Sequence, residues 1–129
     1  MKIPKLKNKA FIIDLVIYPC KVFVVIGNIK QLKPLMLSYK YPPTENELKD
    51  IMNIFDSINN YNGLSVMTEN NSIIWIDKNC DIYNVIPHEV LHTVHDIFIH
   101  LGENNLSKDN QEAYCYLNGY INEQIFKQL

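Results

Sequence analysis

A histidine, a glutamate and a second histidine occur at the spacing His-Glu-x-x-His in residues 88–92. The surrounding hydrophobic pattern predicts a helix, on which residues i and i+4 project from one face about one turn apart. The imidazoles of His88 and His92 can therefore reach one metal ion, and zinc is the ion that this motif typically binds. Glu89 lies about 100° round the helix from His88, where its carboxylate can accept a proton from a metal-bound water. We predict a zinc site with Glu89 as its general base.

A zinc site that activates water has three protein ligands and one open position. His95 shares the helix face of His88, but its Cα lies about 10 Å further along the axis. His100 points about 120° away from that face. Glu112 is the best candidate, because a turn over residues 102–107 brings the next helix back against the first; the alternative is an acid that only stabilises the start of its helix. We therefore predict three metal ligands, namely His88, His92 and Glu112.

The second of these helices carries further polar side chains. Tyr116 lies four residues after Glu112, and a tyrosine hydroxyl near the metal can donate a hydrogen bond to the oxyanion formed on a carbonyl substrate. We predict this catalytic role for Tyr116, with core packing as its alternative. Gly119 is expected to permit close packing of the two helices, and Asp96 is either a partner of a ligand histidine or a solvated charge. Three other tyrosines are alternative donors: Tyr83, Tyr114 and Tyr120.

The elements that must position the motif follow from hydrophobic periodicity and turn residues. Strands are predicted over residues 11–18, 22–26, 64–68 and 73–77, the last two as a hairpin around Glu69-Asn70-Asn71. The prolines at positions 34, 42 and 43 indicate an irregular connection. Helices are predicted over 44–58, 84–101 and 108–127, with Thr44 and Glu47 as a capping box and Ser107 as an N-cap.

These elements predict an α+β fold in a single domain, residues 1–129, in which a small twisted sheet has one covering helix. The two C-terminal helices carry the metal site. If the strand over 73–76 is an edge strand that borders the metal cleft, its main chain can bind an extended peptide in register. The alternative is that this strand lies inside the sheet.

Composition limits the possible partners. The chain has 129 residues, 12 lysines, no arginine and a net charge of −2, which disfavours nucleic-acid binding. No apolar run approaches the roughly 20 residues of a membrane span. Three cysteines without paired spacing fit reduced thiols. We expect a protein of the bacterial or phage-infected cytoplasm, or of a virion, that acts on a peptide or protein.

The run from Ser72 to Asn118 resembles the zincin metallopeptidases, because a strand and a loop lead to the His-Glu-x-x-His motif and a glutamate follows on the next helix. It is most similar to the very small gluzincins found with phage and mobile-element proteins, including those that act on phage-type repressors. Residues 111–117 resemble the Glu-Ala-x-x-x-x-Leu pattern around their third ligand, with one residue fewer between the alanine and the leucine. Residues 112–119 resemble a Glu-Ala-Tyr-x-Tyr-Leu-x-Gly stretch of phage proteins.

This resemblance implies a zincin-like fold and the hydrolysis of peptide bonds. It also implies zinc bound by His88, His92 and Glu112, with Glu89 as the base. Larger gluzincins often carry an acid where Tyr116 stands. The competing hypothesis is a phage or bacterial protein without enzymatic activity that keeps a structural metal, with His95 or Cys115 as a fourth ligand. A weaker one is a fold with neither metal nor activity.

Overall fold

The computed structural model describes residues 6–58, 61–68, 71–103 and 105–129. Four strands form one sheet: β1 (Lys9–Asp14), β2 (Lys21–Ile26), β3 (Gly63–Met67) and β4 (Asn71–Ile76). A 3-10 turn, η1 (Ile29–Gln31), precedes four helices: α1 (Leu32–Leu37), α2 (Glu45–Phe55), α3 (Ile82–His100) and α4 (Gln111–Lys127). The predicted α+β class is confirmed, and the predicted turn at 69–70 lies outside the described residues.

The strand order β1-β2-β4-β3 makes β3 an edge strand and places β4 inside the sheet. β2 and β4 run parallel at the centre, whereas β1 and β3 are antiparallel to their neighbours. Every residue of β4 is buried, as expected for a strand with a partner on each side and helices on each face. The interpretation of residues 73–76 as an edge strand is therefore wrong, and the edge is supplied by β3.

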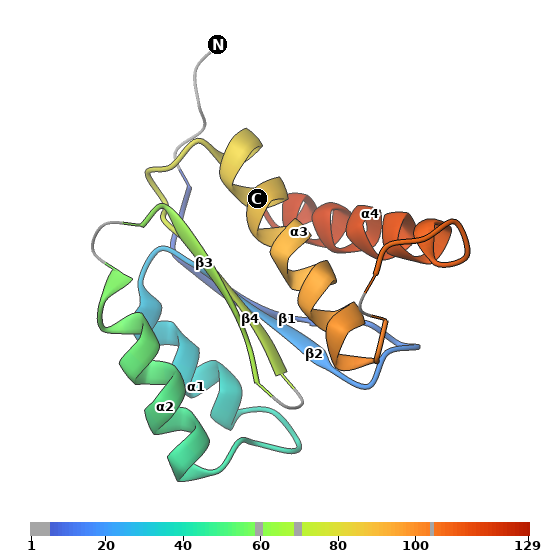
Figure 1. The fold of residues 1–129 in the computed structure, drawn as a ribbon. Helices are drawn as coiled ribbons and strands as arrows, with labels where there is room; N and C mark the ends of the chain where they lie inside the picture. The colour runs from blue at the N-terminus through green and yellow to red at the C-terminus, as the bar shows by residue number, and fades with distance from the viewer. Residues whose placement is uncertain (1–5, 59–60, 69–70, 104) are drawn as a thin grey trace.

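Helices cover both faces of the sheet (Figure 1). α1 and α2 pack on one face, and α3 and α4 pack on the other. Successive strand residues point to opposite faces of the sheet, and both faces of the central strands carry apolar side chains that these helices bury. The main side chains of the first layer are Phe23, Val25, Met36, Phe55, Ile73 and Trp75. Those of the second include Val24, Ile74, Ile86, Val90, Val94 and Ile121.

The first residue of a helix agrees with the sequence prediction for α2 but not for α3 or α4. Thr44 caps α2 as predicted, since its side chain accepts a hydrogen bond from the Glu47 amide at 3.2 Å. α3 begins two residues earlier than predicted, with Asp81 as its N-cap. α4 begins three residues later than predicted, at Gln111, so Ser107 is not its N-cap.

The structure has a helix, α1, where Pro34 led us to expect an irregular connection. Pro34 is the third residue of α1, in the first turn, where a missing amide hydrogen costs no helical hydrogen bond. Within the described ranges, no helix is both long and apolar enough to cross a membrane.

Candidate metal and catalytic site

α3 presents the motif with its polar residues on two different sides. His88 and His92 lie on the exposed face of the helix, whereas Glu89 is turned toward the sheet and buried. The difference follows from the helical period, which rotates consecutive residues by about 100°. The Thr93 hydroxyl donates to the Glu89 main-chain carbonyl at 3.0 Å, a bond made within the buried side of the helix.

The two imidazoles are close enough to share one metal ion. The Nε2 atoms of His88 and His92 are 3.2 Å apart. Two nitrogens bound to one tetrahedral zinc at about 2.0–2.1 Å are about 3.3–3.4 Å apart. The donor types and their separation therefore fit a zinc ion. Without a metal, the same distance lets one ring nitrogen donate to the other.

The Glu89 carboxylate lies beside this pair and close to β3. Its Oε1 is 3.9 Å from Nε2 of His88, and its side chain is 9% exposed. That separation is too long for a hydrogen bond. A carboxylate so deeply buried costs free energy unless a partner compensates it. The arrangement can therefore hold a polar species between the carboxylate and the imidazoles.

Glu112 is not brought to the histidine pair. Within the ranges that the structure describes, no three His, Cys, Asp or Glu side chains form a group able to hold a metal ion. The reason is the side on which α4 packs. Its Tyr114 contacts Phe98, with ring centroids 5.2 Å apart, and its Phe126 stacks on Tyr83 at 6.3 Å.

Tyr83 and Phe98 lie about 120° and 180° round α3 from Glu89. α4 is therefore held against the side of α3 that faces away from β3, and Figure 1 shows α3 between these two elements. The predicted turn does bring the second helix back onto the first, but onto a flank that does not carry the motif.

Tyr116 also lies away from Glu89. Its side chain is 75% exposed and lines an apolar cavity of about 490 Å³ with the β1–β2 turn, including Val16 and Ile17. In this position it has no contact with the motif. Gly119 is exposed, and a Cβ at that position would meet nothing within 4 Å. The interpretation of Gly119 as a close-packing residue is therefore wrong.

The remaining polar candidates are peripheral. His95 and His100 are exposed, and Asp96 lines a shallow cavity of about 430 Å³ with His100 and Thr68. Burial, with a smaller effect of the Asp96 carboxylate, raises the pKa of Tyr114. That tyrosine therefore stays protonated, but it packs on Phe98.

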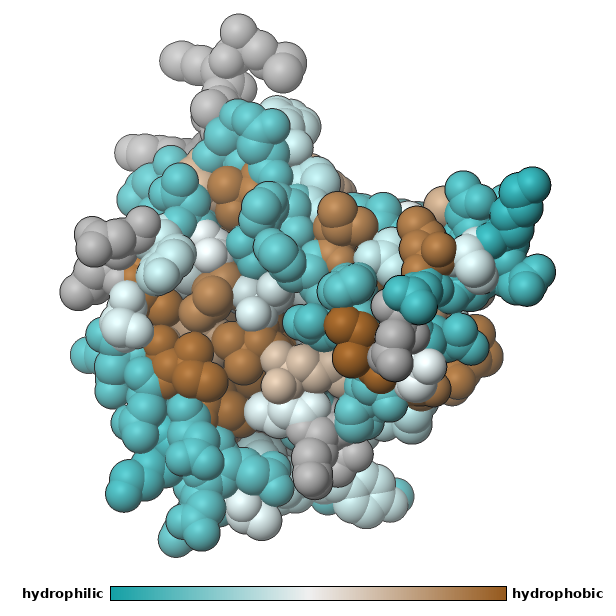
Figure 2. All heavy atoms as spheres, viewed as in Figure 1, coloured by the Kyte–Doolittle hydropathy of each residue, from teal (hydrophilic) through white to brown (hydrophobic). Residues whose placement is uncertain are grey.

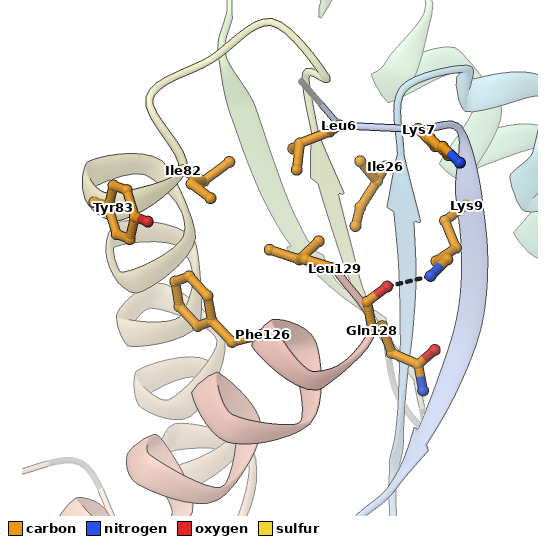
Figure 3. A pocket seen from close by; sticks show the side chains of 9 residues that line it. All are labelled: Leu6, Lys7, Lys9, Ile26, Ile82, Tyr83, Phe126, Gln128 and Leu129. Atoms are coloured by element: carbon orange, nitrogen blue, oxygen red, sulfur yellow. Dashed lines mark hydrogen bonds between the residues drawn. The ribbon is translucent and has the colours of Figure 1, made fainter. Parts of the chain in front are cut away.

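Another cavity, of about 410 Å³, lies between the start of α3 and the end of α4 (Figure 3). Its walls are mainly apolar, with Ile82, Tyr83 and Phe126 among them, and Lys9 donates to the Gln128 carbonyl at its side. Of the predicted site residues only Tyr83, an alternative hydrogen-bond donor, lines this cavity, and the motif residues His88, Glu89 and His92 do not. The chemistry-bearing cluster is therefore the exposed motif face of α3 and not this hollow.

One residue of the site carries no signal in the sequence. Gly63, the first residue of β3, lies directly against the Glu89 side chain. A glycine after a run of asparagines is typical of a turn, so its contact with α3 depends on the tertiary structure. Comparison of the chain with protein-family models gives no match, and comparison with curated proteins and with solved structures gives no significant match.

Proposed function

We propose that the protein is a zinc-dependent metallopeptidase, with a zincin-like site in which His88 and His92 bind the metal and Glu89 is the general base. The observation that carries this proposal is the 3.2 Å separation of the two Nε2 atoms, with the Glu89 carboxylate beside them. When bound, zinc supplies a Lewis acid and lowers the pKa of its water to about 7. Glu89 would then accept the proton of that water.

Glu112 remains the proposed third ligand. In this structure it lies in the first turn of α4, away from the histidine pair. Its role therefore requires the start of α4 to move toward the exposed face of α3 when the metal binds. Metal affinity of a Glu112→Gln variant tests this part separately, because a normal affinity would exclude Glu112 as a ligand.

An extended peptide is the proposed substrate because β3 has an open edge beside Glu89. The Asp77 amide donates to the Asn62 carbonyl and the Thr68 amide to the Asn71 carbonyl, both at 2.8 Å. In an antiparallel pair such bonded positions alternate, so residues 64 and 66 also face β4.

The main-chain groups of Gly63, Ser65 and Met67 consequently point to the other side of β3, where no strand of the described residues pairs with them. A substrate strand can form hydrogen bonds there. Leu64 and Val66 are half-buried, and Figure 2 shows apolar atoms gathered over β3 between α2 and α3. Such a surface favours substrates with apolar side chains.

The decisive experiment compares wild type and Glu89→Gln. Both are stripped of metal, reloaded with zinc, and assayed for metal content and for cleavage of an unfolded protein such as reduced casein. We expect equal zinc content and at least a hundredfold lower turnover in Glu89→Gln, since a general base contributes about 10²–10⁴-fold. Glu123→Gln is the matched control, because Glu123 is exposed and forms a surface ion pair with Lys127, away from the motif.

Two outcomes would contradict the proposal. Wild type without zinc after reloading would exclude the metal site. If the zinc-loaded wild type shows no turnover and unfolds when the zinc is removed, the result would favour the competing hypothesis of a structural metal site.

A further inference from the structure

Gly63 and Glu89 compete for the same space between β3 and α3. A Cβ built on Gly63 would lie 2.8 Å from Cγ1 of Val85, 3.0 Å from Cγ of Glu89 and 3.2 Å from the main-chain oxygen of Trp75. Ordinary van der Waals contacts begin at 3.4 Å. Any residue other than glycine at position 63 therefore forces its neighbours to move.

The neighbours differ in how readily they can move. Trp75 belongs to the central strand β4, whose main chain is held by partners on both sides. Val85 and Glu89 are one turn apart on α3, and their side chains face β3. Since the main chain of β4 is held in place, a Cβ on Gly63 would displace the side chains of Val85 and Glu89.

The requirement for glycine at this position is steric. Gly27 and Gly102 have positive φ angles of 89° and 88°, which favour glycine for conformational reasons, whereas Gly63 is an extended strand residue without a positive φ. Gly119 provides the contrast, because a Cβ there meets nothing.

We infer that Gly63 is a positioning residue: its missing side chain lets Glu89 lie against β3, where the carboxylate is held beside His88. The catalytic consequence rests on the proposed function, whereas the steric contact does not. Ordinary contact requires Cγ of Glu89 to move from 3.0 Å to about 3.4 Å from the new Cβ, a shift of a few tenths of an ångström. A misplacement of about 1 Å costs up to about a hundredfold in rate, so this smaller shift should cost about three- to tenfold.

The first test uses activity and removes the Val85 contact, so that the effect on Glu89 is isolated. Val85→Ala and Gly63→Ala/Val85→Ala are compared for casein cleavage, with Gly119→Ala as the glycine control. We expect kcat to fall about three- to tenfold in the double variant relative to Val85→Ala, with KM and zinc content unchanged. Gly119→Ala should match wild type.

The second test needs no activity. Gly63→Ala is introduced into Val85→Ala and into Val85→Ala/Glu89→Ala, and the melting temperature of the metal-free proteins is measured. We expect Gly63→Ala to lower the melting temperature by several degrees when Glu89 is present and by less than half as much when it is truncated. Equal losses in the two backgrounds would overturn the inference.

These tests separate the two claims. If wild type cleaves casein and the Gly63→Ala/Val85→Ala protein cleaves it as well as Val85→Ala does, the inference is wrong and the proposed function stands. If wild type has no activity, the proposed function fails, and the melting-temperature comparison alone decides whether Gly63 sets the position of Glu89.

Discussion

Metal binding at the histidine pair should be visible as thermal stabilisation of the fold. A ligand that binds only the folded state at a hundred times its Kd stabilises it by about 2.7 kcal/mol. Unfolding entropy of about 2.1 cal/mol/K per residue corresponds to about 0.27 kcal/mol/K for this chain of 129 residues. We therefore expect zinc at that concentration to raise the melting temperature of the wild type by about 10 °C.

His92→Ala removes one of the two imidazoles whose Nε2 atoms lie 3.2 Å apart. Zinc sites of four ligands bind with about 10–16 kcal/mol, so one ligand accounts for a loss of about a hundredfold or more. At the same zinc concentration the variant would then be half occupied at most. Its stabilisation would fall to about 0.4 kcal/mol, which is less than 2 °C.

The assay is thermal unfolding followed by circular dichroism, with and without zinc after chelator treatment. His95→Ala is the matched control, because His95 is an exposed histidine on the same helix, three residues further along. It should keep the full shift of about 10 °C. A wild type without a shift, or a full shift in His92→Ala, would refute the assignment of the pair as metal ligands. An equal loss in His95→Ala and His92→Ala would favour the structural metal with His95 as a further ligand.

Three further predictions concern the fold. Val16 is β-branched, 80% exposed and has φ of 60°, so Val16→Asn should raise the melting temperature by about 4 °C, whereas Ile17→Asn should not. Thr44→Ala removes the cap of α2 and should lower it by about 4 °C. Burial, with a smaller effect of nearby carboxylates, raises the pKa of the Cys80 thiol from 9.0 to about 11. At pH 8 a disulfide reagent should therefore modify the exposed Cys115 before the buried Cys80. The free energy of unfolding should fall between pH 9 and 11, because in that range the Cys80 thiol ionises in the unfolded chain and stays protonated in the folded one.

Clear results would contradict each of these. A lower melting temperature in Val16→Asn would show that the turn does not strain this residue. An unchanged Thr44→Ala protein would mean that the cap contributes nothing, and labelling of Cys80 as fast as Cys115 would mean that the thiol is not buried.

Short-range signals in the sequence predicted most of the elements. The Thr44 cap, the hairpin of β3 and β4 and the two long C-terminal helices depend on contacts within a few residues. α1 was missed because a proline in the first turn of a helix looks the same, in sequence, as a proline in a loop. The strand order was not predictable, since it depends on pairing between β2 and β4, which are far apart in the chain.

The metal-site motif likewise combines features that follow from local sequence with features that depend on distant contacts. His88 and His92 share one face, and Glu89 lies about 100° from His88, because the geometry of a single helix determines all three positions. The position of Glu112 depends on which flank of α3 receives α4, and that is decided by Tyr114 on Phe98 and by Phe126 on Tyr83. Gly63 beside Glu89 depends on β3 being the edge strand under α3. The side chains that one helix presents therefore follow from its own residues, whereas the groups that lie opposite them follow from tertiary packing, because those contacts join segments whose separation no local periodicity encodes.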